Sequence, residues 1–164
     1  MKELINKMLN LEKLESNEDF EIKEINLSKV VSKIALEFES VAYLKKISIN
    51  LDIKENVIIK FNEKMLQELL GILLDNALKY EKEEGNINIK VDNKLLSINN
   101  KNSYINKEEL PNIFNRFYKI EKSRSKEGVG LGLAIAKEIV EKNKGSIKCV
   151  SEMEEGTTFI VIFN

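Results

Sequence analysis

The chain has 164 residues, of which 43% are hydrophobic and 32% charged, and its formal net charge is −1 at pH 7. This balance predicts one globular domain, and the lack of a basic excess argues against a nucleic-acid-binding protein. The single cysteine excludes an internal disulfide, and the absence of histidine removes the commonest general base and metal ligand. No run approaches about 18 consecutive apolar residues, so no membrane span is predicted.

The N-terminal segment predicts a helix over Met1–Glu15, because its apolar residues recur every three or four positions, at Leu4, Met8 and Leu11. Such a stripe suits a partner helix, although a helix that folds back on its own domain would show the same pattern. Ser16–Asp19 follows as a polar break that is typical of a linker.

Between residues 20 and 61 the hydrophobic pattern changes from strand to helix and back to strand. Phe20–Ile25 predicts a short edge strand, and Ser28 is expected to cap a helix whose apolar positions keep the 3.6-residue period as far as Ala42. Alternating apolar residues then predict strands over Ile47–Ile53 and Val57–Phe61.

The next predicted helix, Glu63–Tyr80, is capped by Asn62 and has a broad apolar face. Asn76, Lys79 and Tyr80 share a different strip of this helix, because residues three or four apart lie side by side. Asparagine is a poor helix former, and its carboxamide oxygen is a ligand of the kind that Mg²⁺ prefers. The strip could therefore bind a metal ion, a phosphate and a base together. The alternative is that it is a polar helix face in contact with solvent.

The second half of the chain predicts a hairpin, a short helix and a closing pair of strands. The short helix opens at Lys107–Pro111, and Ser123–Glu127 has the charged, anchor-free composition of a mobile lid. The predicted strands are Ile87–Val91, Leu95–Ile98, Ser146–Ser151 and Thr157–Phe163.

Three glycines, Gly128, Gly130 and Gly132, alternate immediately before an apolar pattern of helical period. Glycine costs about 0.5–1 kcal/mol relative to alanine in regular structure, so three at a helix entrance need a reason. Backbone without Cβ can wrap an anion that the free N–H groups of the helix start then face. The stretch indicates a phosphate site, with a tight turn before a packed helix as the alternative.

Four segments in this order and spacing resemble the ATP-binding catalytic domain of bacterial sensor histidine kinases, within the ATPase superfamily that includes gyrase and MutL. They are Leu74–Tyr80, Ile113–Lys119, Gly128–Leu133 and Gly156–Phe159, and they are similar to the family's asparagine, phenylalanine and second glycine boxes and to its closing strand motif. The resemblance covers residues 20–164. It implies an α+β fold, a two-layer α/β sandwich with a mixed, mostly antiparallel sheet of about five strands and helices on one face.

The resemblance also implies roles for individual residues. Asn76 would coordinate Mg²⁺, Lys79 would contact phosphate, and Tyr80 would lie against the adenine of ATP. Arg116 or Lys119 would help the γ-phosphate, and these two with Asn76 and Lys79 are the implied catalytic residues. The other implied nucleotide-binding residues are Asn100, Gly128, Val129, Gly130, Leu131, Gly132, Leu133 and Thr158.

Residues 3–16 resemble the end of the second helix of the family's dimerisation and phosphoacceptor hairpin. The chain is therefore divided into a remnant of that helix, residues 1–16, and a catalytic domain, residues 17–164. The helix with the phosphorylated histidine is expected to be missing. The implied partners are this hairpin of the same kinase, a response regulator and, in the full-length protein, a second copy. The implied setting is the cytoplasmic part of a kinase in the cell membrane.

Two positions depart from the family pattern. The adenine-recognising Asp-x-Gly-x-Gly box falls at Asn100–Tyr104, where asparagine replaces aspartate and both glycines are lost. Asn100 can still accept a bond from the adenine amino group. Ile72 stands where this family usually has a second asparagine and the gyrase and MutL branch has a glutamate base. Isoleucine cannot activate water, which disfavours hydrolysis by that branch's mechanism.

Three functions are open on this basis. The leading one is transfer of the γ-phosphate of Mg-ATP to a histidine outside this chain and then to a response regulator. The second is a degenerate nucleotide-binding or dimerisation module without kinase activity, which the altered box and Ile72 favour. The third, a serine kinase of the anti-sigma type, would not require the helical segment at the N-terminus.

Overall fold

The fold is taken from a computed structural model that describes residues 1–16, 19–120, 126 and 128–164. Apart from Lys126, the expected lid Ser123–Glu127 lies outside the described residues. The helices are α1 (Lys2–Glu15), α2 (Leu27–Leu44), α3 (Glu63–Tyr80), the 3-10 turn η1 (Leu110–Asn112) and α4 (Gly132–Lys142). The strands are β1 (Lys23–Asn26), β2 (Ser48–Ile53), β3 (Ile58–Phe61), β4 (Asn86–Asp92), β5 (Leu95–Asn100), β6 (Ser146–Glu152) and β7 (Gly156–Ile162).

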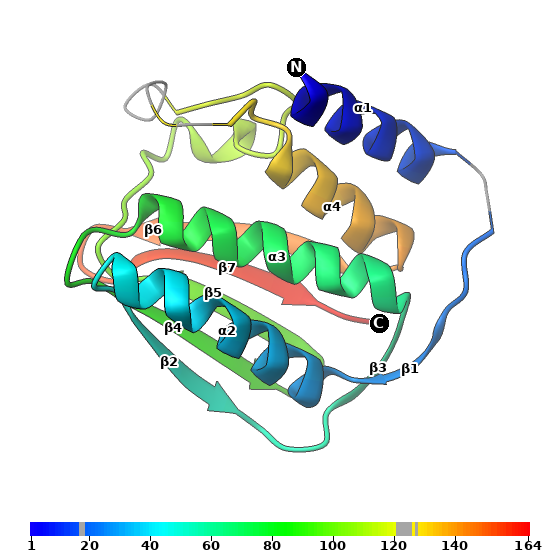
Figure 1. The fold of residues 1–164 in the computed structure, drawn as a ribbon, viewed down its shortest axis with the longest axis horizontal. Coiled ribbons are helices and arrows are strands. Elements are labelled where there is room, and N and C mark those ends of the chain that lie inside the picture. Colours follow the sequence, from blue (N-terminus) through cyan, green and yellow to red (C-terminus); the bar gives the residue numbers. More distant parts are fainter. Residues whose placement is uncertain (17–18, 121–125, 127) are drawn as a thin grey trace.

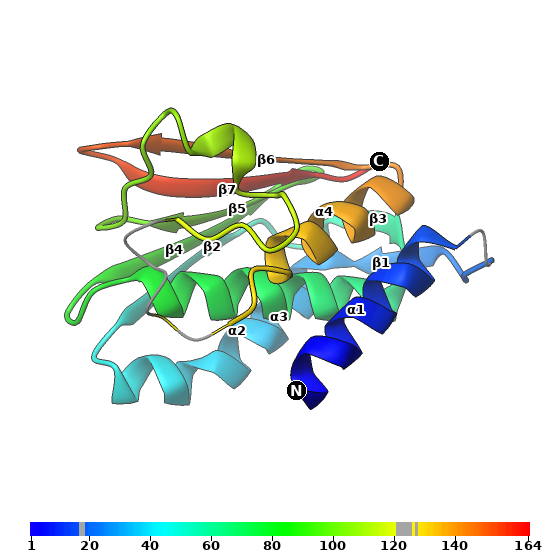
Figure 2. The same cartoon turned by 90° about the horizontal axis from the view of Figure 1, so that it is seen from above.

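The chain folds into two layers, a sheet and a set of helices that cover one of its faces (Figures 1 and 2). The five-stranded sheet has the order β2-β4-β5-β7-β6, and only the β2–β4 pair is parallel. The predicted α+β sandwich with a mixed, mostly antiparallel sheet is confirmed. The strand expected over residues 20–25 forms as β1, but it pairs with β3 in a separate two-stranded sheet.

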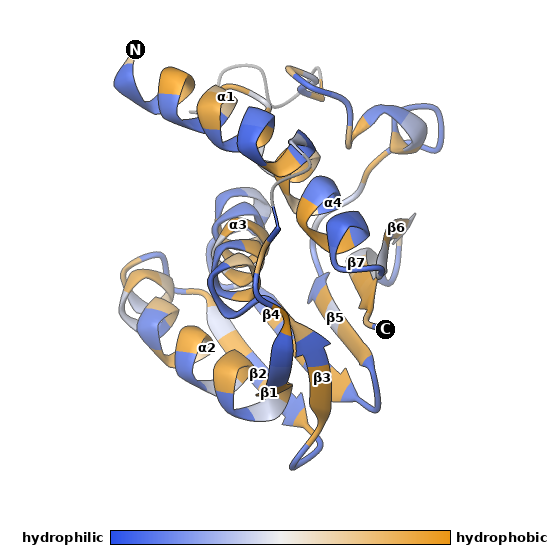
Figure 3. Ribbon diagram, turned by 90° about the vertical axis from the view of Figure 1, so that its right-hand side faces the viewer, coloured by the Kyte–Doolittle hydropathy of each residue, from blue (hydrophilic) through white to orange (hydrophobic). Residues whose placement is uncertain are grey.

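The core lies between the sheet and α3, and its buried apolar residues come from both layers. Figure 3 colours the ribbon of each layer by hydropathy. The α3 face carries Leu66, Leu69, Leu70, Leu73 and Leu74, each at most 1% exposed. Burying one such side chain stabilises the fold by about 1.5–3 kcal/mol, which fixes the rotation of α3 about its axis. As a result, the strip of α3 that carries Asn76 and Lys79 faces the segment that leads into α4.

The start of α2 differs from the prediction. Asn26, not Ser28, is the N-cap, and its side chain accepts a bond from the Lys29 N–H at 3.1 Å. Ser28 is buried, and its hydroxyl donates to the Lys54 carbonyl and accepts from the Val57 N–H. The expected cap at Ser28 is wrong because asparagine caps as well as serine, and the hydroxyl is used to hold the turn between β2 and β3.

Helix α1 lies along α4 (Figure 1). Its buried side chains belong to the same hydrophobic core as the rest of the domain. Leu11 and Leu14 are buried there, and the Asn10 amide donates to the Glu68 carboxylate of α3. Lys142 of α4 donates to main-chain carbonyls at the C-terminal end of α1. The described helices include none with the length and apolar character that a membrane crossing requires.

Candidate functional site

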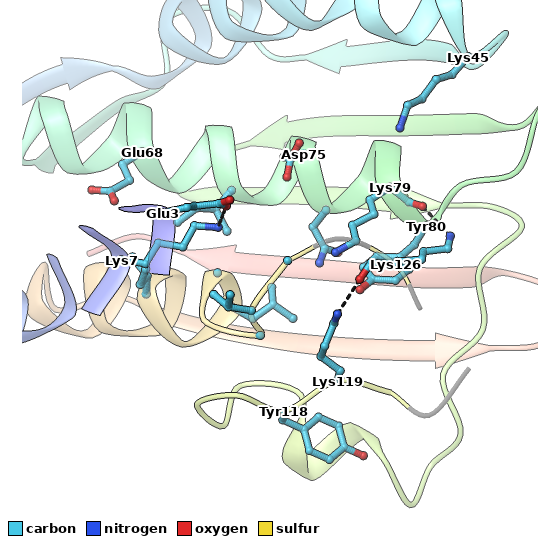
Figure 4. A pocket seen from close by; sticks show the side chains of 18 residues that line it. Glu3, Lys7, Lys45, Glu68, Asp75, Lys79, Tyr80, Tyr118, Lys119 and Lys126 are labelled. Atoms are coloured by element: carbon cyan, nitrogen blue, oxygen red, sulfur yellow. Dashed lines mark hydrogen bonds and ion pairs between the residues drawn. The ribbon is translucent and has the colours of Figure 1, made fainter. Parts of the chain in front are cut away.

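A cavity of about 770 Å³ lies between α3 and the segment that leads into α4 (Figure 4). Asn76, Lys79 and Tyr80 reach it from α3, and Gly128–Gly130 and Gly132 form the opposite wall. These two stretches are about 50 residues apart in the sequence. The fold brings them to one place because α3 and α4 pack against each other on the same face of the sheet.

The glycine wall is shaped by close approach. Gly128 and Gly130 have φ angles of 114° and 75°, a region that favours glycine. A Cβ at Gly128 would lie 2.9 Å from Lys79 Nζ, and a Cβ at Gly130 would lie 2.8 Å from the Phe117 carbonyl carbon. The glycines therefore admit the Lys79 ammonium on one side and the backbone of the preceding segment on the other.

Helix α4 begins at the floor of this cavity. Its N-cap is Leu131, which supplies no side-chain acceptor, so the first N–H groups of the helix lack a side-chain cap. Such a helix start carries a partial positive charge and attracts anions. With the glycine backbone beside it, this end of the cavity has the chemistry of a phosphate site.

Charged side chains line the same cavity. Among the described residues, cationic groups outnumber carboxylates, since Lys7, Lys45, Lys79, Lys119 and Lys126 stand against Glu3, Glu68 and Asp75. Some of these groups pair with one another. A hydrogen bond from Lys7 at 2.6 Å lowers the pKa of Glu3, and burial raises the pKa of Glu68 against the opposing effect of Asn10. The excess of positive charge favours an anionic ligand.

A second cavity of about 260 Å³ adjoins the first and shares six lining residues with it: Asn76, Tyr80, Tyr118, Lys119, Lys126 and Leu133. Its other walls come from the end of β5, the loop that follows, the residues on either side of η1, Ile120 and β7. Asn100 is buried in this wall, where its Nδ2 donates to the Ala77 carbonyl of α3 at 2.6 Å. The bond leaves the carboxamide oxygen of Asn100 as an acceptor. This smaller, partly apolar space suits a nucleobase.

The comparison with known proteins identifies the family. Residues 61–164 match the family described as "Histidine kinase-, DNA gyrase B-, and HSP90-like ATPase". The chain belongs to this ATPase family. The resemblance inferred from the sequence segments is thereby confirmed.

Similar proteins include a sensor protein and a sensor histidine kinase. The chain is 34% identical over 161 residues to the sensor protein DltS of Streptococcus agalactiae, covering 94% of this chain and 41% of that protein. It is 32% identical over 168 residues to the sensor histidine kinase YkoH of Bacillus subtilis, covering 100% of this chain and 37% of that protein. The chain thus spans about two fifths of the length of these relatives.

The solved catalytic domain of histidine kinase ThkA has the same fold. It superimposes with a TM-score of 0.77 at 24% sequence identity, covering 88% of this chain and 95% of that domain.

Not every residue that the family resemblance pointed to faces the two cavities. Asn76, Lys79, Tyr80, Lys119 and most of the glycine segment line the large one, and Asn100 lines the small one. Arg116 lines neither and forms an ion pair with Glu15 of α1. The Leu131 side chain is buried in the core.

Thr158 also lies away from both cavities. It is directed to the sheet face opposite the helices, where its hydroxyl accepts a bond from Asn99 at 2.9 Å. Thr157, the neighbouring residue of β7, lines the small cavity instead. Side chains alternate along a strand, so the buried Phe159 and Val161 already assign position 157 to the helix-facing side. That alternation is the signal that would have found Thr157.

Three other residues that line the cavities were not predicted as site residues, because the sequence marks them weakly or not at all. Tyr118 lies inside one of the recognised segments, and Lys126 lies in the expected lid. Lys45 follows α2, and its Nζ donates to the Leu78 carbonyl of α3 at 3.4 Å. No local pattern marks Lys45, because its approach depends on how α2 packs beside α3.

Ile72, the residue that departs from the family pattern, lies beside the start of α4. A Cβ at Gly132 would lie 3.5 Å from Ile72 Cγ2, an ordinary packing distance. The isoleucine therefore fills space between α3 and α4 at the edge of the large cavity. An apolar contact here accounts for the residue without a role in metal binding.

Proposed function

We propose that the chain is the catalytic and ATP-binding domain of a two-component sensor histidine kinase. It transfers the γ-phosphate of Mg-ATP to a histidine outside this chain, and the phosphoryl group then passes to a response regulator. One observation carries the proposal: Asn76 and the glycine segment line a single cavity in which cationic groups predominate. The names of DltS and YkoH as sensor proteins support it.

Each end of the site has a proposed role in binding ATP. The glycine backbone and the start of α4 hold the phosphates, with Lys79 and Lys119 supplying positive charge. Tyr80 lies against the adenine, and the carboxamide oxygen of Asn100 accepts a bond from its amino group. Phosphoryl transfer asks little covalent chemistry of a protein, so positioning and charge are what these residues contribute.

The residues present also fit a magnesium ion. The Asn76 carboxamide and the Asp75 carboxylate line the same cavity, and oxygen donors of this kind suit Mg²⁺. Asn76 is the proposed ligand. The ion, when bound, would neutralise phosphate charge during transfer.

The relatives suggest the setting in which this domain acts. In the proposal it belongs to a longer, membrane-anchored kinase and works on the cytoplasmic side. A helical hairpin of the same kinase carries the acceptor histidine and joins two copies, and α1 is the end of its second helix. The greater length of DltS and YkoH, of which this chain spans 41% and 37%, supports the part of the proposal that places the domain in a longer kinase.

Calorimetric titration with a non-hydrolysable ATP analogue and Mg²⁺ tests the binding step. Asn76→Ala should weaken binding by about 10- to 100-fold or more, since loss of even an indirect metal contact has effects of this size. Asn50→Ala is the matched control, because Asn50 is exposed on β2 and should leave binding unchanged. Absence of binding at millimolar nucleotide would overturn the proposal.

The transfer step is tested with radiolabelled ATP and a separately produced, folded hairpin that carries the acceptor histidine. The hairpin should become labelled by the wild-type domain and not by the Asn76→Ala variant. If the nucleotide binds but no label appears, the chain is the non-catalytic binding module. If label appears on serine in place of histidine, the domain is a protein kinase of another kind.

A further inference from the structure

Arg116 is turned away from the cavity that the nucleotide would fill. Its guanidinium forms an ion pair with the Glu15 carboxylate at the C-terminal end of α1, and it is absent from the linings of both cavities. Its backbone is nevertheless close to the site, because the next residue, Phe117, donates from its N–H to the Gly130 carbonyl at 2.9 Å. The direction of one side chain therefore decides whether Arg116 serves α1 or the cavity.

The Glu15 carboxylate is held close to the Arg116 guanidinium, because other contacts fix α1 to the domain. Leu11 and Leu14 are buried against the domain, and Asn10 bonds to Glu68 of α3. Lys142 of α4 donates to the Leu14 carbonyl at 2.7 Å. These contacts keep the end of α1 beside Arg116 independently of the ion pair.

The ion pair itself is weak enough to be exchanged. The Arg116 and Glu15 side chains are 49% and 38% exposed, so water and salt screen their attraction. A terminal phosphate carries more charge than a carboxylate and offers guanidinium the same paired geometry. A triphosphate in the adjoining cavity is a competing partner for Arg116.

We propose that Glu15 is a positioning residue that withholds Arg116 from the γ-phosphate, so that the α1 contact and bound ATP compete for one guanidinium. This rests on the proposed function. Removing the carboxylate should release Arg116 and tighten the binding of a triphosphate. A diphosphate, which lacks the γ-phosphate, should not respond. An exposed pair of this kind corresponds to a change of about 1.5- to 5-fold in affinity.

Calorimetric titrations of the 164-residue chain with Mg²⁺ and either ADP or a non-hydrolysable ATP analogue make the test. Glu15→Gln should bind the ATP analogue about 1.5- to 5-fold more tightly than wild type, with ADP affinity unchanged. Glu12→Gln is the matched control, because it removes the same charge from an exposed position of α1, one turn earlier. It should leave both affinities unchanged.

The same substitution in an Arg116→Met background decides whether the effect acts through the guanidinium. There Glu15→Gln should have no effect on either nucleotide. The proposal is overturned if the gain persists without Arg116, if ADP gains equally, or if Glu12→Gln gives the same gain. If the wild-type chain binds neither nucleotide, the proposed function fails as well, so the two failures are distinguishable.

Discussion

The two adjoining cavities are built in different ways. The larger, which suits phosphates, includes two stretches that a local motif marks, the end of α3 with Asn76 and the segment Gly128–Gly132, beside single side chains from α1 and from other parts of the chain. The smaller, which suits a base, draws side chains that are scattered between Asn76 and Phe159, from α3, β5, α4, β7 and the segments between them. Backbone recognition demands glycine at fixed positions and leaves a local motif. Recognition by scattered side chains leaves almost none, because many residue combinations can line such a space.

Gly156→Ala should be the most damaging change at the base end. Gly156 has a φ of 83°, and a Cβ there would collide with the Asn100 carbonyl oxygen. A left-handed non-glycine residue costs about 1–2 kcal/mol and overpacking about 1–3 kcal/mol. Urea denaturation should therefore show a loss of about 3 kcal/mol in the free energy of unfolding. Adenosine, ADP and the ATP analogue should all bind more weakly, since the base wall moves.

Gly71→Ala is the control for Gly156→Ala. Gly71 lies within α3 and has open space around the position of a Cβ, so alanine should raise stability by about 0.5–1 kcal/mol. An unchanged stability of Gly156→Ala, or a loss confined to the triphosphate, would show that the two ends are not separate units.

Gly130→Ala should affect the phosphate end alone. With a φ of 75° and a Cβ 2.8 Å from the Phe117 carbonyl carbon, alanine forces the glycine segment away from the preceding backbone. The affinity for ADP and for the ATP analogue should fall about tenfold or more, as expected when backbone donors to a charged group are displaced. Adenosine binding, followed by ligand-observed NMR, should be retained. An equal loss for adenosine would contradict the division into two ends.

Asn100→Ala should reduce both stability and base recognition. It removes the 2.6 Å bond to the Ala77 carbonyl, which keeps its other bond from the Glu81 N–H at 3.0 Å, so the loss of this one buried hydrogen bond costs about 1–1.5 kcal/mol. Asn99→Ala, at the neighbouring position on the opposite sheet face, should cost less than about 1 kcal/mol and leave nucleotide binding intact. Denaturation and adenosine titration of the pair measure the difference. Equal effects would assign Asn100 a general role in the sheet.

The sequence predicted the larger cavity better than the smaller one for a physical reason. The limits of α3 were predicted correctly as Glu63–Tyr80, because a clear apolar period, an Asn62 cap and strong tertiary burial agree. The short helix expected after Lys107 is only η1, although apolar residues recur at helical spacing as far as Tyr118. Phe117 has a φ of 62°, and its N–H donates to the Gly130 carbonyl instead of to a helical partner.

The sequence motifs did not predict the direction in which individual side chains point. Thr158 belongs to a recognised segment, yet its strand parity directs it away from the site. Arg116 lies in the phenylalanine-rich segment, yet its partner Glu15 is about 100 residues earlier in the chain. A motif fixes where the backbone goes. The partner of a long side chain depends on tertiary packing that no local pattern encodes.

Glu68→Gln sharpens the comparison at the wall of the larger cavity where α3 meets α1, and its effect should be the smallest. Burial raises the pKa of Glu68 above its ordinary value of 4.5, and the Asn10 bond opposes this shift. The stability that this group contributes is therefore full below the unfolded pKa and is lost as the pH rises through the folded pKa. Glutamine stays neutral and still accepts from Asn10.

The Glu68→Gln variant should accordingly be more stable than wild type at neutral pH, by less than about 1 kcal/mol because the side chain is half-buried. The difference should disappear as the pH falls toward 4, which melting temperatures across this range would measure. Glu12→Gln, at an exposed position of α1, should run parallel to wild type. A difference that grows toward acid would mean that the carboxylate is stabilised by its partner more than burial destabilises it, and that α1 is held to α3 by charge.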